Sequence, residues 1–352
     1  MIPIRNVYYM LVYAYKALFW HEFKNLSNER FDNIDELYSE ILAKGMAYQI
    51  KRGIQRDYIN QTEDTSTIHG KLNVSESIKT QAILRRRAVC TFDDFSVNSR
   101  INQVVKAAMN VLYRHLEPKS PHRKNLIKIL ALLDEVDDVN IHTIDWNFHY
   151  NRNNELYRLL VGISYLAIHR RILAEQKGAT GLANLFDDQK MCDLYEHFIL
   201  NFFKRHYPGL RPSPLLIDWS VDDNFSELLP VMKTDITLTG PTQTLVVDAK
   251  YYESGILKSN TRYLDSPEKL SSGNMYQIYT YVKNMDKNHT GNVSGMLLYA
   301  KTTEARTPDH KYSIDGNIFY ARCLDLNKEF EDIAAQLRQI AELVYGNNSQ
   351  QE

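Results

Sequence analysis

The stretch Lys233-Thr-Asp-Ile-Thr-Leu-Thr-Gly-Pro-Thr-Gln-Thr-Leu-Val-Val-Asp-Ala-Lys-Tyr-Tyr252 contains two acids and a lysine in an apolar, β-branched setting. Residues 234–239 and 244–251 are rich in residues that favour strands, and the Gly-Pro-Thr-Gln segment between them favours a turn. The pattern predicts an antiparallel hairpin.

The register of this hairpin decides where its charged side chains lie. Pairing Thr239 with Thr244 places Asp235 opposite Asp248, with Cβ atoms roughly 4.5–5.5 Å apart. Lys250 lies two residues beyond Asp248 and points to the same face. Like charges opposite each other destabilise a sheet unless a cation compensates, and Mg²⁺ suits two hard carboxylate oxygens. The sequence therefore predicts a Mg²⁺ site at Asp235 and Asp248.

Such a site suits phosphodiester hydrolysis, because a bound metal neutralises phosphoryl charge and activates water while a lysine helps to place that water. The alternative is structural: strand acids often lie at sheet ends in water, and a D-x-K triplet is frequent by chance. The apolar run Leu245–Val247 favours the functional interpretation, since it delivers Asp248 at the end of a buried strand.

The spacing of Asp235, twelve intervening residues and Asp248-Ala-Lys250 resembles the PD-(D/E)XK motif of restriction endonucleases and DNA-repair nucleases. The resemblance implies an α/β/α nuclease domain in which both acids and the carbonyl of Ala249 bind metal. It also implies that Lys250 orients or activates water. Thr234 stands where the motif has proline, which is a departure from the pattern.

Two predicted helices flank the hairpin, at residues 194–206 and 274–282. Many PD-(D/E)XK enzymes contribute a further metal carboxylate from a helix ahead of the hairpin, so the resemblance makes Glu196 a candidate ligand; a solvated glutamate is the alternative. Gln277 and Tyr281 lie on one helix face. They resemble the Q-x-x-x-Y helix of RecB-like nucleases, which implies a positioning role, whereas ordinary packing is the alternative.

Several further segments resemble one family, the McrC proteins, which are nuclease subunits of McrBC-type modification-dependent restriction systems. The most family-specific segment is the Arg-Asn-x-Tyr-Tyr-Met-Leu opening. The matching segments span nearly the whole chain in the expected order: residues 2–15, 69–72, 194–196, 229–230, 234–237, 247–252 and 275–277.

This resemblance implies a two-protein machine. The N-terminal domain would dock on a hexameric AAA+ GTPase of the McrB type, which recognises modified DNA and translocates it. The McrC-like chain would cut double-stranded, methylcytosine-containing DNA and stimulate GTP hydrolysis. The sequence has no G-x-x-x-x-G-K-[ST] motif, so GTP is expected on the partner. The alternatives are a stand-alone PD-(D/E)XK restriction or repair nuclease and a nuclease-dead activator of an AAA+ motor.

Length and composition bound the organisation. We expect an α/β (α+β overall) chain of 352 residues with two domains: a mixed helix and strand partner-binding stalk at 1–153 and the nuclease domain at 154–352. The net charge of −1 favours dependence on a partner over autonomous tight DNA binding. The three cysteines lack C-x-x-C spacing, and no signal peptide or membrane-spanning run occurs, so a cytoplasmic location is expected.

The N-terminal half is expected to hold helices at 7–19, 34–51 and 99–116 and strands at 55–59 and 67–74 around a polar turn. Arg85, Arg86 and Arg87 are either a solvated run or a contact to partner or DNA. Asp93 and Asp94 are predicted to be turn and capping residues. In the C-terminal half, residues 293–299 and 314–324 are predicted strands, and 330–344 a helix.

Overall fold

The computed structural model describes residues 2–19, 23, 26, 29–151, 154–177, 189–223, 225–251, 257–258, 269–301 and 307–345. Its contacts divide the chain into two compact units, one formed by Met1–Phe19 with Lys177–Glu352 and the other by Trp20–Gln176. Among the described helices, none combines the length and apolar character needed to cross a membrane.

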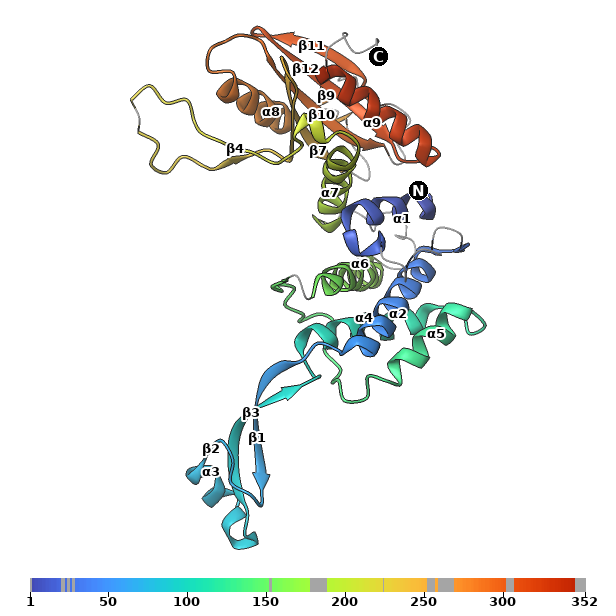
Figure 1. Ribbon diagram of the computed structural model, residues 1–352, viewed down its shortest axis with the longest axis vertical. Coiled ribbons are helices and arrows are strands. Elements are labelled where there is room, and N and C mark those ends of the chain that lie inside the picture. The colour runs from blue at the N-terminus through green and yellow to red at the C-terminus, as the bar shows by residue number, and fades with distance from the viewer. Residues whose placement is uncertain are drawn as a thin grey trace. The chain divides into compact units, whose positions relative to one another are not determined.

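The unit that contains Asp235 and Asp248 is built on a mixed sheet between helices (Figure 1). Its described helices are α1 Ile4–Ala14, α7 Gln189–His206, α8 Ser272–Met285 and α9 Phe330–Tyr345. Its described strands are β4 Leu216–Ile217, β5 Met232–Lys233, β6 Ile236–Thr239, β7 Thr244–Lys250, β8 Leu257–Lys258, β9 Lys269–Leu270, β10 Val293–Lys301, β11 His310–Ile314 and β12 Asn317–Asp325. The mixed α/β architecture expected from the sequence is confirmed.

Within the described residues the main sheet has the order β11-β12-β10-β7-β6. Strand β10 runs parallel to both β7 and β12, whereas β6 and β11 are antiparallel edge strands. The carboxyl ends of β7, β10 and β12 therefore meet at one edge of the sheet. In open α/β sheets, that edge is where ligands bind.

The predicted hairpin is confirmed. Strands β6 and β7 pair with Thr239 opposite Thr244, as the turn chemistry indicated. The predicted strand over residues 314–324 is correct for β12, but residues 310–314 form a separate strand, β11. Gly316 adopts a φ of +81° in the turn between β11 and β12, a conformation that glycine adopts without strain.

Helix α8 covers one face of the sheet, and α9 lies on the other side of the strands (Figure 1). Ile278 and Val282 of α8 pack with Val246 and Leu297 in one buried apolar cluster. Because side chains alternate along a strand, Asp248 and Lys250 share the face of Val246, which is the face that α8 covers.

Helix α1 packs on α7, in the same unit as the sheet. The side chain of Asn6 is buried and donates hydrogen bonds to the carbonyl oxygens of Leu326 (2.8 Å) and Lys328 (2.7 Å), after β12. Tyr9 and Phe330 stack with centroids 4.2 Å apart. Asn6 and Tyr8 of the Arg-Asn-x-Tyr-Tyr opening are therefore buried in this unit, whereas Arg5 is exposed.

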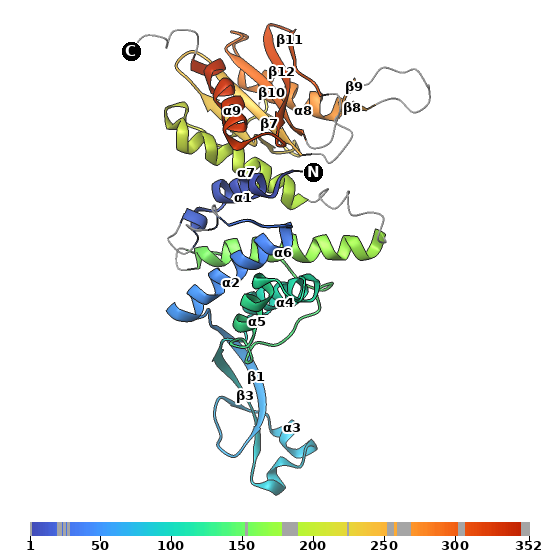
Figure 2. The same cartoon turned by 90° about the vertical axis from the view of Figure 1, so that its right-hand side faces the viewer.

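The other unit is mainly helical and carries an antiparallel ribbon (Figure 2). Its described helices are α2 Ile34–Arg52, α3 Val74–Lys79, α4 Arg100–His115, α5 Pro121–Leu130 and α6 Glu155–Lys177, and its strands are β1 Asp57–Thr65, β2 Lys71–Leu72 and β3 Ala88–Ser96. A Cβ atom at Gly45 of α2 would lie 2.5 Å from a methyl carbon of Leu160 in α6, so a larger residue at position 45 would require the Leu160 side chain to shift.

The ribbon corrects the expected strand assignments. Residues 60–65, predicted to be a turn, continue β1, and β1 pairs along its whole length with β3. Asp93 and Asp94, predicted to be turn and capping residues, lie within β3. Polar residues suit this ribbon because no position of β1 and only two positions of β3 are buried, so the apolar alternation that marks a half-buried strand is missing.

These two units do not coincide with the domains expected at 1–153 and 154–352. Helix α1 joins the sheet unit, and Tyr157 of α6 donates a hydrogen bond to Asn102 Oδ1 (2.7 Å) in the ribbon-bearing unit. Residues 152–153, beside the expected boundary, lie outside the described residues. The division follows packing across the chain, which a linear composition change does not reveal.

Candidate active site

Asp248 is a fully buried acid near the carboxyl end of β7, with an exposed fraction of 0%. Among the described residues, no group donates a well-formed hydrogen bond to either of its carboxylate oxygens. The Lys250 ammonium forms an ion pair with it, with Nζ 2.9 Å from Oδ2. Buried carboxylates normally have several donors, so two oxygens without hydrogen bonds mark Asp248 as unusual.

Asp235 reaches the same place from the antiparallel neighbour. It directly precedes β6, and continuing the observed register by one residue sets it beside Asp248. Its Oδ2 accepts a hydrogen bond from the main-chain N–H of Ala249 at 2.9 Å. The two acids and Lys250 are therefore brought together as the hairpin predicted.

The electrostatics of the pair explain its chemical character. Burial raises the pKa of the Asp248 carboxyl to about 7, with the Lys250 ammonium opposing the shift and the negative charge of Asp235 adding to it. A carboxylate in this position is costly to ionise without a further cation. The site therefore favours binding of positive charge.

Gln277 and Tyr281 of α8 extend the site through hydrogen bonds. Lys250 Nζ donates to Gln277 Oε1 at 3.2 Å, and Gln277 Nε2 donates to the Tyr281 hydroxyl at 2.9 Å. Tyr281 is buried, so the chain of contacts ends on a fixed group. The expected spacing on one helix face is confirmed, and the contacts give Gln277 a geometric means of orienting Lys250.

Glu196 approaches from α7. Its pKa is raised to about 7, first because its carboxyl is partly buried and then because Asp235 and Asp193 lie near enough to repel its charge. The structure thus places Glu196 in the electrostatic neighbourhood of the site. A fully solvated glutamate, the alternative considered from the sequence, would not show this burial.

The donor chemistry fits a hard divalent cation. Magnesium ions often use only one or two protein carboxylates and keep several waters. Asp235 and Asp248 supply two, and the oxygens of Asp248, which accept no well-formed hydrogen bond from the described residues, are suitable ligand atoms. Over the described residues, no three His, Cys, Asp or Glu side chains converge tightly enough to hold an ion by themselves. The fit is therefore to a water-rich magnesium site and not to a protein cage.

One supporting residue escaped the sequence analysis. Asn274 is buried at the start of α8, and its Nδ2 donates to the Tyr299 hydroxyl at 3.3 Å. Tyr299 pairs with Lys250 in the parallel register of β10 and β7. Asn274 thus ties α8 to the strand beside the site. Its only signal in the sequence is a polar residue one helical turn before Gln277.

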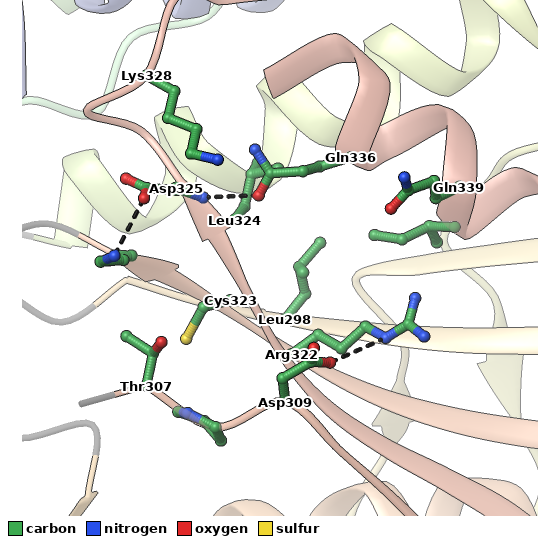
Figure 3. A pocket seen from close by; sticks show the side chains of 13 residues that line it. Leu298, Thr307, Asp309, Arg322, Cys323, Leu324, Asp325, Lys328, Gln336 and Gln339 are labelled. Atoms are coloured by element: carbon green, nitrogen blue, oxygen red, sulfur yellow. Dashed lines mark hydrogen bonds and ion pairs between the residues drawn. The ribbon is translucent and has the colours of Figure 1, made fainter. Parts of the chain in front are cut away.

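A separate cavity of about 300 Å³ lies where β10 and β12 end, near α9 (Figure 3). Its charges are largely matched: Lys301 Nζ lies 3.0 Å from Asp325 Oδ2, and Arg322 Nε lies 3.6 Å from Asp309 Oδ1. The main-chain N–H of Asp325 also donates a hydrogen bond to Gln336 Oε1 at 3.1 Å. These pairings contrast with the unsatisfied carboxylate of Asp248.

Comparison with known proteins supplies the family. Residues 5–300 match the model of the family described as McrBC 5-methylcytosine restriction system component. The chain belongs to this McrBC family. A relative from Escherichia coli (strain K12), the type IV methyl-directed restriction enzyme EcoKMcrBC, is 27% identical over 346 residues, which covers 96% of this chain and 97% of the relative.

Two solved structures from Thermococcus gammatolerans are also similar. One is a refined half-complex from a tetradecameric assembly of McrB AAA+ hexamers with bound McrC, at 17% identity and a TM-score of 0.48, covering 96% of this chain and 76% of that chain. The other is a McrBC complex at 19% identity and a TM-score of 0.40, covering 58% of each chain. The assignment to the McrBC family follows from the sequence match over residues 5–300.

Proposed function

We propose that this McrBC family member is a Mg²⁺-dependent endonuclease subunit that cuts methylcytosine-containing DNA when assembled with an AAA+ GTPase, whose GTP hydrolysis it stimulates. The observation that carries the proposal is Asp248, a fully buried acid without hydrogen bonds to its oxygens, beside Asp235 and Lys250. The hairpin, α7 and α8 would then form the PD-(D/E)XK domain.

The residues have distinct roles in this proposal. Asp235 and Asp248 would hold the ion, with the Ala249 carbonyl and Glu196 as further candidate ligands. When bound, Mg²⁺ neutralises phosphoryl charge and lowers the pKa of a coordinated water. Lys250 orients the attacking water or the scissile phosphate, and Gln277 holds the Lys250 ammonium in place with support from Tyr281. Asp248 must be ionised to act as a ligand.

A protein partner is supported by the far end of the ribbon in the other unit. Ile78, Ile83 and Leu84 are exposed there, with exposed fractions of 62%, 56% and 80%. Clustered exposed apolar side chains commonly mark protein interaction sites. Arg85 and Arg87 both pair with Asp64, at 2.7 and 2.8 Å, which reduces the charge they offer to DNA. We therefore favour a partner contact over a DNA contact for this surface.

The proposal is tested by plasmid cleavage. Methylated and unmethylated plasmids are incubated in Mg²⁺ with the purified chain alone, then with a McrB-type AAA+ partner and GTP. Cleavage of methylated DNA that needs partner and GTP supports the proposal. Cleavage by the chain alone supports the stand-alone nuclease instead, and GTPase stimulation without cleavage supports the nuclease-dead activator.

A ribbon variant separates docking from chemistry. Leu84→Ser should reduce GTPase stimulation by about tenfold or more if Leu84 is a central contact, and it should leave Mn²⁺ binding by the sheet unit unchanged. Ile127→Ser, which changes a 48% exposed apolar residue on α5, is the matched control and should retain stimulation. Equal stimulation by both variants would contradict docking through this end of the ribbon.

A further inference from the structure

A β-bulge lies beside Asp235, in the strand segment that leads into β6. Ser213 bridges Thr237, and Leu216 pairs with Lys233. On one segment, two residues, 214–215, lie between Ser213 and Leu216. On the opposite segment, three residues, 234–236, lie between Lys233 and Thr237. The segment that carries Asp235 therefore contains one extra residue. Bulges are frequent next to active sites because they redirect a side chain.

The bulge changes the face to which Asp235 points. Met232 lies in the buried cluster with Ile278 of α8. Along an unbroken strand, residues three apart point to opposite faces, so Asp235 would face away from α8. The extra residue reverses this alternation. Both Met232 and Asp235 can then lie on the face that α8 covers, where Asp248 is found.

A bulge disturbs the ladder and leaves main-chain groups to be satisfied in another way. Here the N–H of Leu215 donates to the hydroxyl of Thr234 at 2.8 Å, while the N–H of Thr234 donates to the Leu215 carbonyl at 2.9 Å. The neighbouring residue on the opposite segment is Pro214, which has no N–H to satisfy. The side chain of Thr234 thus replaces a main-chain acceptor in the ladder.

Thr234 is held from a second direction as well. Its exposed fraction is 1%, and its Oγ1 lies 3.0 Å from the Oγ1 of Thr237, a residue that is itself fully buried. Thr237 in turn exchanges two main-chain hydrogen bonds with Ser213, at 2.8 and 3.2 Å. Asp235 therefore lies between two residues that are both anchored to the segment 213–215.

We infer that Thr234 is the positioning residue of this bulge and aims Asp235 at Asp248. The inference rests on the proposed function, because it concerns how the first acid of that site is directed. Asp235 and Asp248 repel each other when both are ionised, so an edge segment without such an anchor would relax apart. Thr234 itself touches no reacting group and acts through Asp235.

The test uses the full-length protein and Mn²⁺ as the probe, with affinity measured by titration calorimetry. Thr234→Val and Thr234→Ala both remove the hydroxyl, the first keeping the side-chain volume and the second relieving any crowding. Each should weaken Mn²⁺ binding by about tenfold or more, as loss of an outer support of a metal site commonly does. Thr234→Ser keeps the hydroxyl and should bind within about twofold of the parent.

Thr290→Val controls for a general loss of stability. The Thr290 hydroxyl donates to Asp286 at 2.9 Å, far from the bulge in sequence and at the opposite end of β10. This variant should melt at a lower temperature and retain its Mn²⁺ affinity. Thermal melts of all variants show which of them are folded.

The outcomes separate this inference from the proposed function. If the parent binds Mn²⁺ and the folded hydroxyl-free variants bind equally well, the role of Thr234 is refuted while the proposed metal site stands. A similar loss in Thr234→Ser and Thr234→Val would also refute it, because side-chain packing would then explain the effect. A parent protein that binds no Mn²⁺ would overturn both.

Discussion

Two buried aspartates in the sheet unit have opposite environments. Asp286 follows α8, before the start of β10, and its carboxylate accepts hydrogen bonds from Thr290, Gly291 and Asn317. Burial opposes its ionisation, yet these donors lower its pKa to about 2. Asp248, toward the other end of the parallel strands, has no such donors among the described residues, and burial raises its pKa to about 7.

The difference shows which of the two acids stabilises the folded state. The carboxylate of Asp286 closes a loop and links it to Asn317 at the start of β12, so its charge is stabilising. Asp248 contributes a charge that the fold leaves poorly compensated. Strongly perturbed acids cluster at functional sites, so the environment of Asp248 supports the role proposed for it.

The largest effect should come from removing the poorly compensated acid. Asp248→Ala should reduce DNA cleavage by more than about 100-fold, since even outer supports of metal sites commonly contribute 10–100-fold. Stimulation of the partner's GTPase should persist, because the ribbon is untouched. The measurement is plasmid cleavage beside GTP hydrolysis in the same assembled complex.

Asp325→Asn is the matched control for Asp248→Ala. Asp325 ends β12, which β10 separates from β7 in the sheet, and it forms an ion pair with Lys301. Unlike Asp248, it is not fully buried. Its variant should cut DNA at a rate within a few-fold of the parent. Equal loss of cleavage in both variants would show that removing any acid at this edge of the sheet stops cleavage, and that Asp248 has no special role.

The next largest effect concerns stability. Asp286→Asn should lower the free energy of unfolding by on the order of 2–3 kcal/mol, because hydrogen bonds to a charged acceptor are lost and buried donors become poorly paired. The pKa of Asp286 is lowered in the folded protein. Its contribution to the free energy of unfolding is therefore present above pH 3.8, the ordinary pKa of aspartate, and is lost as the pH falls toward 2. Urea unfolding at pH 7 measures the loss, and an unchanged midpoint would contradict the structural role.

Asp248→Asn should act in the opposite direction. The pKa of Asp248 is raised in the folded protein, because the protonated carboxyl suits its buried position. Its contribution to stability is therefore fully present below pH 3.8, the ordinary pKa of aspartate, and is lost as the pH rises through about 7. Without divalent ions at pH 8, the Asn variant should therefore melt a few degrees higher than the parent, at about 2–4 °C per kcal/mol. The advantage should shrink at pH 5, and a lower melting temperature at pH 8 would refute the comparison.

The smallest effect tests the same rule in the ribbon-bearing unit. Glu40 is buried, but hydrogen bonds from His122 and Asn125 and the charge of Lys44 lower its pKa despite that burial. The hydrogen bond to Glu40 raises the pKa of His122. The pair should stabilise the fold most between pH 4.5 and 6.5, the ordinary pKa values of glutamate and histidine. Its contribution should fall as the pH rises through the elevated pKa of His122.

His122→Gln measures that contribution. The parent should lose stability relative to this variant as the pH is raised from 6 to 8, by no more than about 1 kcal/mol, because a glutamine can keep one neutral hydrogen bond to Glu40. Thermal melts across this range provide the test. A difference that is independent of pH would mean that the ionised pair contributes nothing.

Much of the candidate site could be predicted from local sequence. The hairpin register follows from a four-residue turn and alternating side chains, and it brings Asp235, Asp248 and Lys250 together. Gln277 and Tyr281 were predictable as neighbours on a helix face. The elements that were predicted wrongly are those with weak local sequence patterns. The ribbon formed by β1 and β3 is polar, and residues 66–87 lie between these two strands in the chain. Neither periodicity nor turn chemistry therefore identified the pairing.

The sequence by itself determined the charged triad, the main helices and the membership in the McrBC family, because these depend on short-range spacing and on motifs in order. Only the tertiary structure decided three other matters: that α1 belongs with the sheet, that Asp248 is buried without hydrogen bonds, and that a bulge redirects Asp235. Each depends on contacts between segments far apart in the chain. Burial and satisfaction of a polar group are properties of the surrounding packing, which no local pattern records.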